Sequence, residues 1–205
     1  MDLYLFIQTE PGLATTVMNT LTESKAVTRA ASVTGAFDVF ARIDDVDFDE
    51  LTTRLVDRVQ RTPGVVRTIT AAGLSAEVMS IWPVPTMPLR VDPALPQALV
   101  FVRLQPGSGT VAVERLAHSK SVLSFALLTG EYDAVMQVSG RTIEDIAKKV
   151  LRDIQTVPGV VSTSTSLVAA VTPLPGRGRR KTNVTRTRVK RPIKRPAKKS
   201  RRPKR

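Results

Sequence analysis

One pattern of apolar and polar residues occurs twice in the chain, with a constant offset of 95 positions. The apolar runs LYLFI, from Leu3, and ALVFV, from Ala98, are typical of short buried strands, and a Pro-Gly pair that can begin a helix follows each run. Solenoid repeats have periods of about 20 to 50 residues, so an offset of this length indicates a duplicated domain. Later landmarks that keep the offset are Gly35 with Gly130, Asp38 with Asp133, and the PGVV at Pro63 with the PGVV at Pro158.

Each copy predicts two helices and four strands. After the first helix, AVTRAASVTG and TGAFDVFARI read as two strands that meet at a Thr-Gly turn. The second helix is clearest in the second copy, where Thr142 and Asp145 form a capping signature, and Asp47 and Glu50 take the aligned positions in the first copy. Segments rich in Val and Thr, GVVRTIT and GVVSTST, are the predicted fourth strands. The apolar stripe of the clearest helix has a period of 3.6 residues and consists of Ile143, Ile146, Val150, Leu151 and Ile154.

The order β-α-β-β-α-β is the ferredoxin-like pattern, so the predicted fold class is α+β. In this fold both helices cover one face of the sheet, yet the first strands are apolar at odd and even positions alike. The second face must therefore be covered too, and the sheet of the other copy, packed face to face, is the most economical cover. The chain is predicted to be an intrachain pseudo-dimer.

Composition divides the chain further. The predicted domains are residues 1–73 and 97–173, joined by a stiff Pro-rich linker at 74–96 and followed by a tail at 174–205. From Gly176 onward there are 16 Lys or Arg residues and no acid, whereas the rest holds 15 basic and 18 acidic residues. The net charge of +13 therefore describes a mildly acidic globule with a basic arm. Like charge and few apolar residues predict that this arm is disordered when free.

The tail is the predicted nucleic-acid-binding segment. An arm of positive charges binds phosphate without a fold, and sequence preference should be low because no aromatic residue is present for base stacking. It resembles the basic tails of nucleoid-associated proteins, which makes DNA the expected partner ahead of RNA; a solubilising tail is the alternative. The predicted contacts are Arg177, Arg179, Arg180, Lys181, Arg186, Arg188, Lys190, Arg191, Lys194, Arg195, Lys198, Lys199, Arg201, Arg202, Lys204 and Arg205.

The sequence offers few groups for catalysis or metal binding. There is no cysteine, and the single histidine, His118, is expected on the surface of a helix. The acidic stretch DDVDFDE, from Asp44, lacks the spacing of a calcium loop and fits a helix start, and no phosphate loop of Walker or Rossmann spacing occurs. We therefore expect no catalytic residue, metal site or cofactor. No segment fits a signal peptide or a membrane span, which predicts a soluble cytoplasmic protein without a membrane partner.

The duplicated hairpin has two interpretations. A turn glycine and a solvated carboxylate explain Gly35 with Asp38, and Gly130 with Asp133, without any function. Alternatively, the carboxylate binds an ammonium group, backbone N–H groups bind a carboxylate, and threonine hydroxyls of the fourth strand lie nearby, which together make a small-molecule pocket. Duplication does not decide between them, because a duplicated fold also copies its turns.

The motif T-G-x-[FY]-D, followed after a helix by P-G-V-V-x-T-x-T, resembles the C-terminal effector domain, or RAM domain, of the Lrp/AsnC transcription regulators. The resemblance covers about Leu3–Ala71 and Gln97–Val171. It implies βαββαβ units that dimerise through their sheets, assemble further and bind amino acids or related small molecules near the hairpin. The family's N-terminal helix-turn-helix does not precede the first effector strand, so operator recognition through that module is not expected. Carried over by position, the resemblance implies one pocket of Gly35, Phe37, Asp38, Thr68 and Thr70, and a second of Gly130, Tyr132, Asp133, Thr163 and Thr165.

Three functional hypotheses follow. The leading one is a non-enzymatic Lrp/AsnC-like regulator or amino-acid sensor that self-associates through its RAM domains and holds nucleic acid through its tail. The second is an architectural nucleic-acid-binding protein with no ligand. The third is an enzyme of the dimeric α+β barrel type, which the unduplicated His118 and the lack of a polar cluster disfavour; a cavity lined by His, Asn or Trp between the sheets would favour it.

Overall fold

The structure is a computed structural model, and it describes residues 2–44, 47, 53–74 and 94–172. The chain divides into a compact unit, Met1–Leu174, and a second segment, Pro175–Arg205. Residues 75–93 of the predicted linker, most of the acidic stretch and all the predicted nucleic-acid contacts of the tail lie outside the described residues. The fold below is that of the first unit.

The elements follow one another in the same order twice. The first series is β1 (Leu3–Thr9), α1 (Ala14–Glu23), β2 (Arg29–Val33), β3 (Val39–Ile43), η1 (Thr53–Gln60) and β4 (Val65–Gly73). The second series is β5 (Gln97–Leu104), α4 (Gly109–Ala117), β6 (Val122–Thr129), β7 (Ala134–Ser139), α5 (Ile143–Lys149), η2 (Val150–Ile154) and β8 (Val160–Val171). The wide helical turns η1 and η2 are of the π type, and η2 directly continues α5. The prediction of an α+β fold with ferredoxin-like order is confirmed for the second series.

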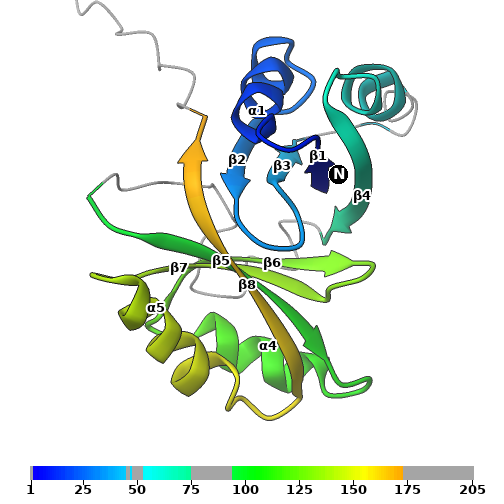
Figure 1. Cartoon of the computed structure of the whole chain (residues 1–205). Coiled ribbons are helices and arrows are strands. Elements are labelled where there is room, and N and C mark those ends of the chain that lie inside the picture. Colours follow the sequence, from blue (N-terminus) through cyan, green and yellow to red (C-terminus); the bar gives the residue numbers. More distant parts are fainter. Residues whose placement is uncertain (1, 45–46, 48–52, 75–93, 173–205) are drawn as a thin grey trace, which may run out of the picture. The chain divides into compact units, whose positions relative to one another are not determined.

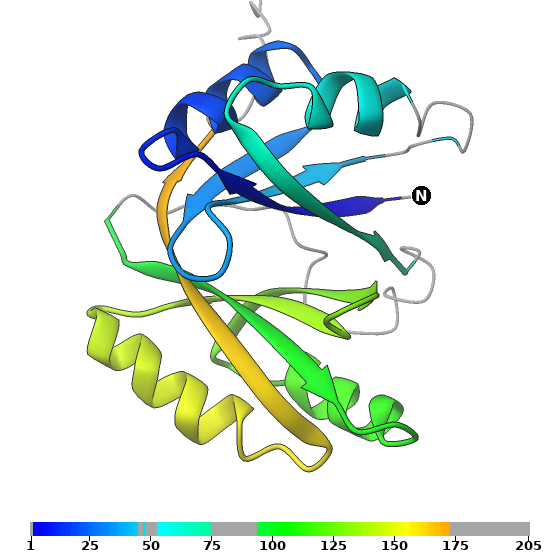
Figure 2. The ribbon, with the colours of Figure 1, turned by 45° about the vertical axis from the view of Figure 1, so that its right-hand side comes forward.

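Within each series the antiparallel strands have the order fourth, first, third, second, as in ferredoxin-like sheets. Strand β1 lies between β3 and β4, and β5 lies between β7 and β8 (Figure 1). Each first strand is thus central in its sheet, which explains why both faces of LYLFI are apolar. Helix α1 lies on one outer side of the strands and helices α4 and α5 lie on the other (Figure 2).

Three apolar clusters form the core of the unit. The odd positions of β1, such as Leu5, pack against Leu21 and other residues of α1, and a matching cluster lies between β5 and its helices. The even positions Tyr4 and Phe6 belong to a third cluster, together with Phe101 of β5. The Phe6 and Phe101 rings have their centroids 5.2 Å apart. Aromatic rings from both series therefore fill the space between the two sets of strands.

Strands of the two series also pair edge to edge, and the described strands close into a barrel of eight. We call the pairing of β2 with β8 the β2–β8 seam and the pairing of β4 with β6 the β4–β6 seam. At the first seam the Thr34 N–H donates to the Leu167 carbonyl over 2.9 Å. At the second seam the Thr129 hydroxyl donates to the Ala72 carbonyl over 3.3 Å. Because these two pairs differ by the same 95 positions, the Thr-Gly turns contact equivalent residues in the fourth strand of the other series, through the N–H of Thr34 and the hydroxyl of Thr129.

The second helix of the second series differs in part from its predicted stripe. Ile146, Val150 and Ile154 are buried, as expected, but Ile143 and Leu151 are 57% and 59% exposed. Ile143 is the first residue of α5, at the exposed start of the helix. The buried positions lie four residues apart and the helix widens at Val150, so Leu151 lies beside the buried row. The predicted cap is confirmed, since the Thr142 hydroxyl accepts a hydrogen bond of 3.1 Å from the Asp145 N–H. The aligned cap in the first series needs Glu50, which is outside the described residues.

Candidate functional site

The duplicated aspartates hold the hairpins against the first strands. The Asp133 carboxylate accepts a hydrogen bond of 2.7 Å from the Leu104 N–H, at the end of β5. In the first series the Asp38 carboxylate accepts one of 2.8 Å from the Thr9 N–H, at the end of β1. The main-chain N–H groups of Asp133 and Asp38 donate to Val102 and Ile7, each over 2.9 Å. Both carboxylates therefore fix the hairpin to the end of the first strand of their series, and are more than the solvated side chains of the simpler interpretation.

The glycines of the two Thr-Gly turns have backbone conformations that other residues rarely adopt. The φ angle is +115° at Gly35 and +137° at Gly130. A Cβ atom on Gly35 would also lie 3.1 Å from the Ser166 hydroxyl oxygen of β8. The turn glycine of the first hairpin thus permits a positive φ and a close approach to the other series.

The hairpin of the second series carries an additional set of contacts. The Arg103 guanidinium donates to the Glu131 carbonyl over 3.1 Å and to the Glu131 carboxylate over 2.8 Å. It also lies over the Tyr132 ring, 5.3 Å from the centroid. At the matched position of the first series, the Gln8 amide donates to the Ala36 carbonyl over 2.9 Å. The two corners therefore share a backbone arrangement but differ in charge.

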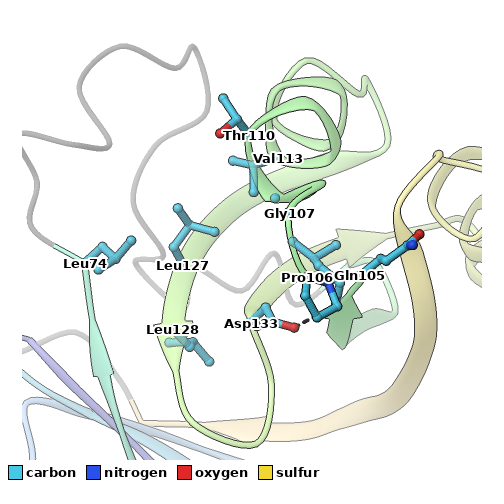
Figure 3. Close-up of a pocket in the computed structure, with 11 residues that line it drawn as sticks. Leu74, Gln105, Pro106, Gly107, Thr110, Val113, Leu127, Leu128 and Asp133 are labelled. Atoms are coloured by element: carbon cyan, nitrogen blue, oxygen red, sulfur yellow. Dashed lines mark hydrogen bonds between the residues drawn. The ribbon is translucent and has the colours of Figure 1, made fainter.

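A pocket of about 620 Å³ lies beside Asp133 (Figure 3). Its walls come from the loop after β5, the first turns of α4, the end of β6, and Leu74, which follows β4. Among the described residues of the lining, Asp133 has the one charged side chain. The volume of the pocket is within the usual range for small-molecule sites. The apolar side chains of the wall are Leu74, Leu104, Pro106, Val113, Leu127 and Leu128, and the polar ones besides Asp133 are Gln105 and Thr110.

The structure divides each predicted set of site residues between the two sides of a sheet. Phe37 and Tyr132 pack in or against the cluster between the two sets of strands. The threonines of the fourth strands are register partners of Leu5, Ile7, Val100 and Val102, whose side chains face the helices. They are Thr68 and Thr70 in β4 and Thr163 and Thr165 in β8.

Two of these threonines bind a side chain from the end of the second helix. The Gln60 amide donates to the Thr68 hydroxyl over 3.3 Å, and the Gln155 amide donates to the Thr163 hydroxyl over 2.7 Å. Thr165 instead lines a separate hollow of about 320 Å³ beside α5. Of the second predicted set, Asp133 alone lines the pocket described above.

The apolar wall of the pocket was missed from the sequence. Leu127 and Leu128 stand at the end of a predicted strand, where an apolar pair carries no distinct signal for a ligand site. Leu74 comes from the other series, so only the three-dimensional contact between copies brings it to the pocket.

Other groups capable of chemistry are few in the described part of the chain. The His118 Nδ1 atom is 2.7 Å from the Glu114 carbonyl on the exposed face of α4, in agreement with the predicted surface position. Within the described ranges, no group of three His, Cys, Asp or Glu side chains could hold a metal ion, and no helix is long and apolar enough to cross a membrane. Burial raises the pKa of Tyr4 to about 12, which keeps this phenol neutral at physiological pH.

Comparisons with known proteins agree with the resemblance seen in the sequence. Residues 97–172 match the family model described as the Lrp/AsnC ligand binding domain. An uncharacterised HTH-type transcriptional regulator of Pyrococcus abyssi (strain GE5 / Orsay) is 28% identical over 74 residues, which cover 36% of this chain and 47% of the regulator. The chain thus spans about half the length of this curated relative.

Two solved structures also match parts of the chain. The siroheme decarboxylase NirDL, in complex with an iron-uroporphyrin III analogue, matches with a TM-score of 0.58 at 12% identity, over 83% of this chain and 72% of that one. This likeness shows the fold alone. AsnC of E. coli matches with a TM-score of 0.37 at 20% identity, over 46% of this chain and 65% of that one. The family model thus relates residues 97–172 to the Lrp/AsnC ligand binding domain.

Proposed function

We propose that the chain is a regulator-like module without catalytic activity, and that its pocket beside Asp133 binds a small molecule carrying an amine. The observation that supports this most is that every residue of the pocket lining except Leu74 belongs to the segment that matches the Lrp/AsnC ligand binding domain. Among the described residues of its lining, Asp133 has the one charged side chain, and four leucines belong to the same lining. This combination suits a ligand with a cationic and an aliphatic end.

The chemistry of Asp133 narrows the class of ligand. One carboxylate oxygen accepts the Leu104 N–H, and an ionised carboxylate has further lone pairs for a second donor. An ammonium group supplies that donor together with the opposite charge. The leucines would take an aliphatic side chain, so an aliphatic amino acid is the expected ligand. Its 2-oxo acid analogue lacks the ammonium group and would supply no positive charge to the Asp133 carboxylate.

A thermal-shift experiment on the full chain tests this proposal with L-leucine and its analogue 4-methyl-2-oxopentanoate. L-leucine should raise the melting temperature and the oxo acid should not, because a ligand that binds only the native state stabilises it. Asp133→Asn, which keeps an oxygen that can accept the Leu104 N–H, should remove the response. Asp38→Asn is the matched control and should retain it. An equal response to both compounds, or an unchanged response in Asp133→Asn, would reject the proposal.

We further propose that residues 1–73 and 97–173 are two RAM-like domains that form an intrachain pseudo-dimer across the linker 74–96. The equivalent contacts of Thr34 with Leu167 and of Thr129 with Ala72 support a two-fold relation between the copies. The shared aromatic cluster supports it as well, since it covers the sheet face that each copy would otherwise expose. Self-association of whole chains, as the family resemblance implies, is part of this proposal.

We also propose that the tail holds nucleic acid, with DNA as the expected partner and a cytoplasmic, nucleoid-associated location. Its 16 positive charges and lack of acids support electrostatic binding to phosphates. Deleting residues 176–205 should abolish retention on DNA–agarose without changing the melting temperature. If about 6 to 10 phosphates are neutralised, affinity of the full chain should fall about 10³- to 10⁵-fold between 50 and 200 mM salt. Unchanged retention after the deletion would reject this role.

The alternative of an enzyme has the barrel likeness to the siroheme decarboxylase in its favour, and that likeness concerns the fold alone. The space between the two sets of strands is occupied by the rings of Phe6, Phe40 and Phe101, whose centroids are 5.2 to 5.8 Å apart. This packing supports a core rather than a substrate chamber there. An absorbance titration with an iron porphyrin should give no saturable complex, whereas tight stoichiometric binding would favour the enzyme.

A further inference from the structure

The pocket beside Asp133 is built across the β4–β6 seam. Leu74 follows β4 of the first series, while Leu127 and Leu128 end β6 of the second, and all three line the pocket. The Leu74 N–H donates to the Leu127 carbonyl over 3.1 Å. In the same seam, Ala72 is the register partner of Thr129. One wall of the pocket therefore exists only while the two strands remain paired.

We infer that filling this pocket and closing the β4–β6 seam are coupled, so that a ligand carries a signal from the second copy to the first. This inference rests on the proposed function and adds how binding at the site is transmitted. A ligand shifts an equilibrium only through its different affinity for two states. Leu74 provides that difference, because its side chain meets the ligand when the seam is paired and moves away when it opens.

The exposure of Leu74 shows what a ligand would gain from the closed seam. Leu74 is 40% exposed, whereas Leu128 is 6% exposed. An aliphatic group in the pocket would remove the remaining apolar surface of Leu74 from water, which favours binding to the paired state. By reciprocity, the bound ligand must stabilise the pairing to the same extent.

The seam includes a contact that a substitution can weaken without altering the pocket. The Thr129 hydroxyl donates to the Ala72 carbonyl over 3.3 Å, but Thr129 is not part of the lining. The matched residue of the β2–β8 seam is Thr34, whose hydroxyl accepts a hydrogen bond of 3.1 Å from the Leu167 N–H. Thr129→Val and Thr34→Val therefore each remove one hydroxyl hydrogen bond from a seam, a donated one at Thr129 and an accepted one at Thr34, and only the β4–β6 seam borders the pocket.

A covalent probe tests the coupling without knowledge of the natural ligand. The chain has no cysteine, so Thr110→Cys places a single thiol in the lining and Thr15→Cys places one at the aligned position of α1. Each full-length variant is labelled with benzyl methanethiosulfonate, and hydrogen exchange is measured at the Leu74 amide. Labelling Thr110→Cys should slow this exchange about tenfold relative to the unlabelled variant, and labelling Thr15→Cys should leave it unchanged. No effect from Thr110→Cys, or equal effects from both, would overturn the inference.

Titration with L-leucine then separates the inference from the proposed function. Thr129→Val should weaken L-leucine binding about 2- to 10-fold, as expected for loss of one hydrogen bond, while Thr34→Val should bind as the unsubstituted chain does. Equal affinities in Thr129→Val and Thr34→Val would overturn the coupling even if L-leucine binds. If L-leucine fails to bind the unsubstituted chain, the proposed ligand class is wrong, and the labelled Thr110→Cys protein still decides whether filling the pocket closes the seam.

Discussion

At the scale of single residues, the sequence showed that Asp38 and Asp133 are equivalent but not what their side chains do. Their duplication at a constant offset marks a feature of the fold, and the structure explains it by the hydrogen bonds to the Thr9 and Leu104 N–H groups. The sequence could not show this role, because the partner is a backbone group on a strand 29 positions away. The threonines of the fourth strands were predicted to share a pocket with Phe37 and Tyr132. Strand alternation instead places these threonines on the helix side of the sheet, away from the two aromatic rings.

Tyr4 provides a test at this scale. It is 1% exposed, and burial raises its pKa from the ordinary 10 to about 12, with the Arg42 guanidinium acting in the opposite direction. The folded state therefore keeps the phenol proton more tightly than the unfolded state. The stability linked to this proton is fully present below about pH 10 and is lost as the pH rises toward 12.

In urea unfolding at pH 9, 10 and 11, the free energy of unfolding should thus fall as the pH rises. The fall should be smaller in Tyr4→Phe, because phenylalanine has no proton to release. Tyr132→Phe is the matched control and should keep the fall. If Tyr4 ionises near pH 10 in the folded protein, as judged by tyrosinate absorbance, the burial assigned to this ring is wrong.

At the scale of elements, the sequence predicted the start of the second helix of the second series better than it predicted which of the helix's apolar residues are buried. The cap at Thr142 was visible in the sequence because it depends on two residues three positions apart. The exposure of Leu151 was not visible, because a 3.6-residue stripe does not anticipate the widening of the helix at Val150. A sequence motif therefore predicted the structure correctly where, as in this cap, the interacting residues are neighbours in the chain.

The cap of α5 gives the prediction for this scale. Thr142→Ala removes the oxygen that accepts the Asp145 N–H and should lower the free energy of unfolding by about 1 kcal/mol. Thr142→Ser keeps an oxygen at this position and should be close to the unsubstituted protein. Urea unfolding at pH 7 measures both. A Thr142→Ala variant as stable as Thr142→Ser would mean that the cap contributes nothing to the stability of the second series.

At the scale of the whole molecule, the constant offset and the doubly apolar first strands predicted two units that cover each other. Which strand ends meet across the copies was beyond the sequence, since β2–β8 and β4–β6 pairing joins residues more than 50 positions apart. The pocket is hidden for the same reason: its lining includes Leu74 of one series and Leu127 of the other. Sites of this kind depend on tertiary contacts and leave no continuous motif.

Separate expression of residues 1–73 and 97–173 tests the proposed pseudo-dimer. Each half alone would expose the aromatic cluster that contains Phe6 or Phe101, so the halves should associate when mixed. Light scattering after size exclusion should detect a one-to-one complex, and Phe101→Asp in the second half should prevent it. Two folded halves that remain apart at high micromolar concentration would contradict an intrachain pseudo-dimer.

The most direct test of the proposed function is to locate a bound amino acid by methyl NMR. The spectrum of the full chain, labelled at Leu and Val methyl groups, is recorded during titration with L-leucine. The shifts should concentrate on the Leu and Val residues of the pocket lining, Leu74, Leu104, Val113, Leu127 and Leu128, and should vanish in Asp133→Asn. Saturating shifts centred elsewhere in the chain, or none at millimolar L-leucine, would contradict an amine-binding site beside Asp133.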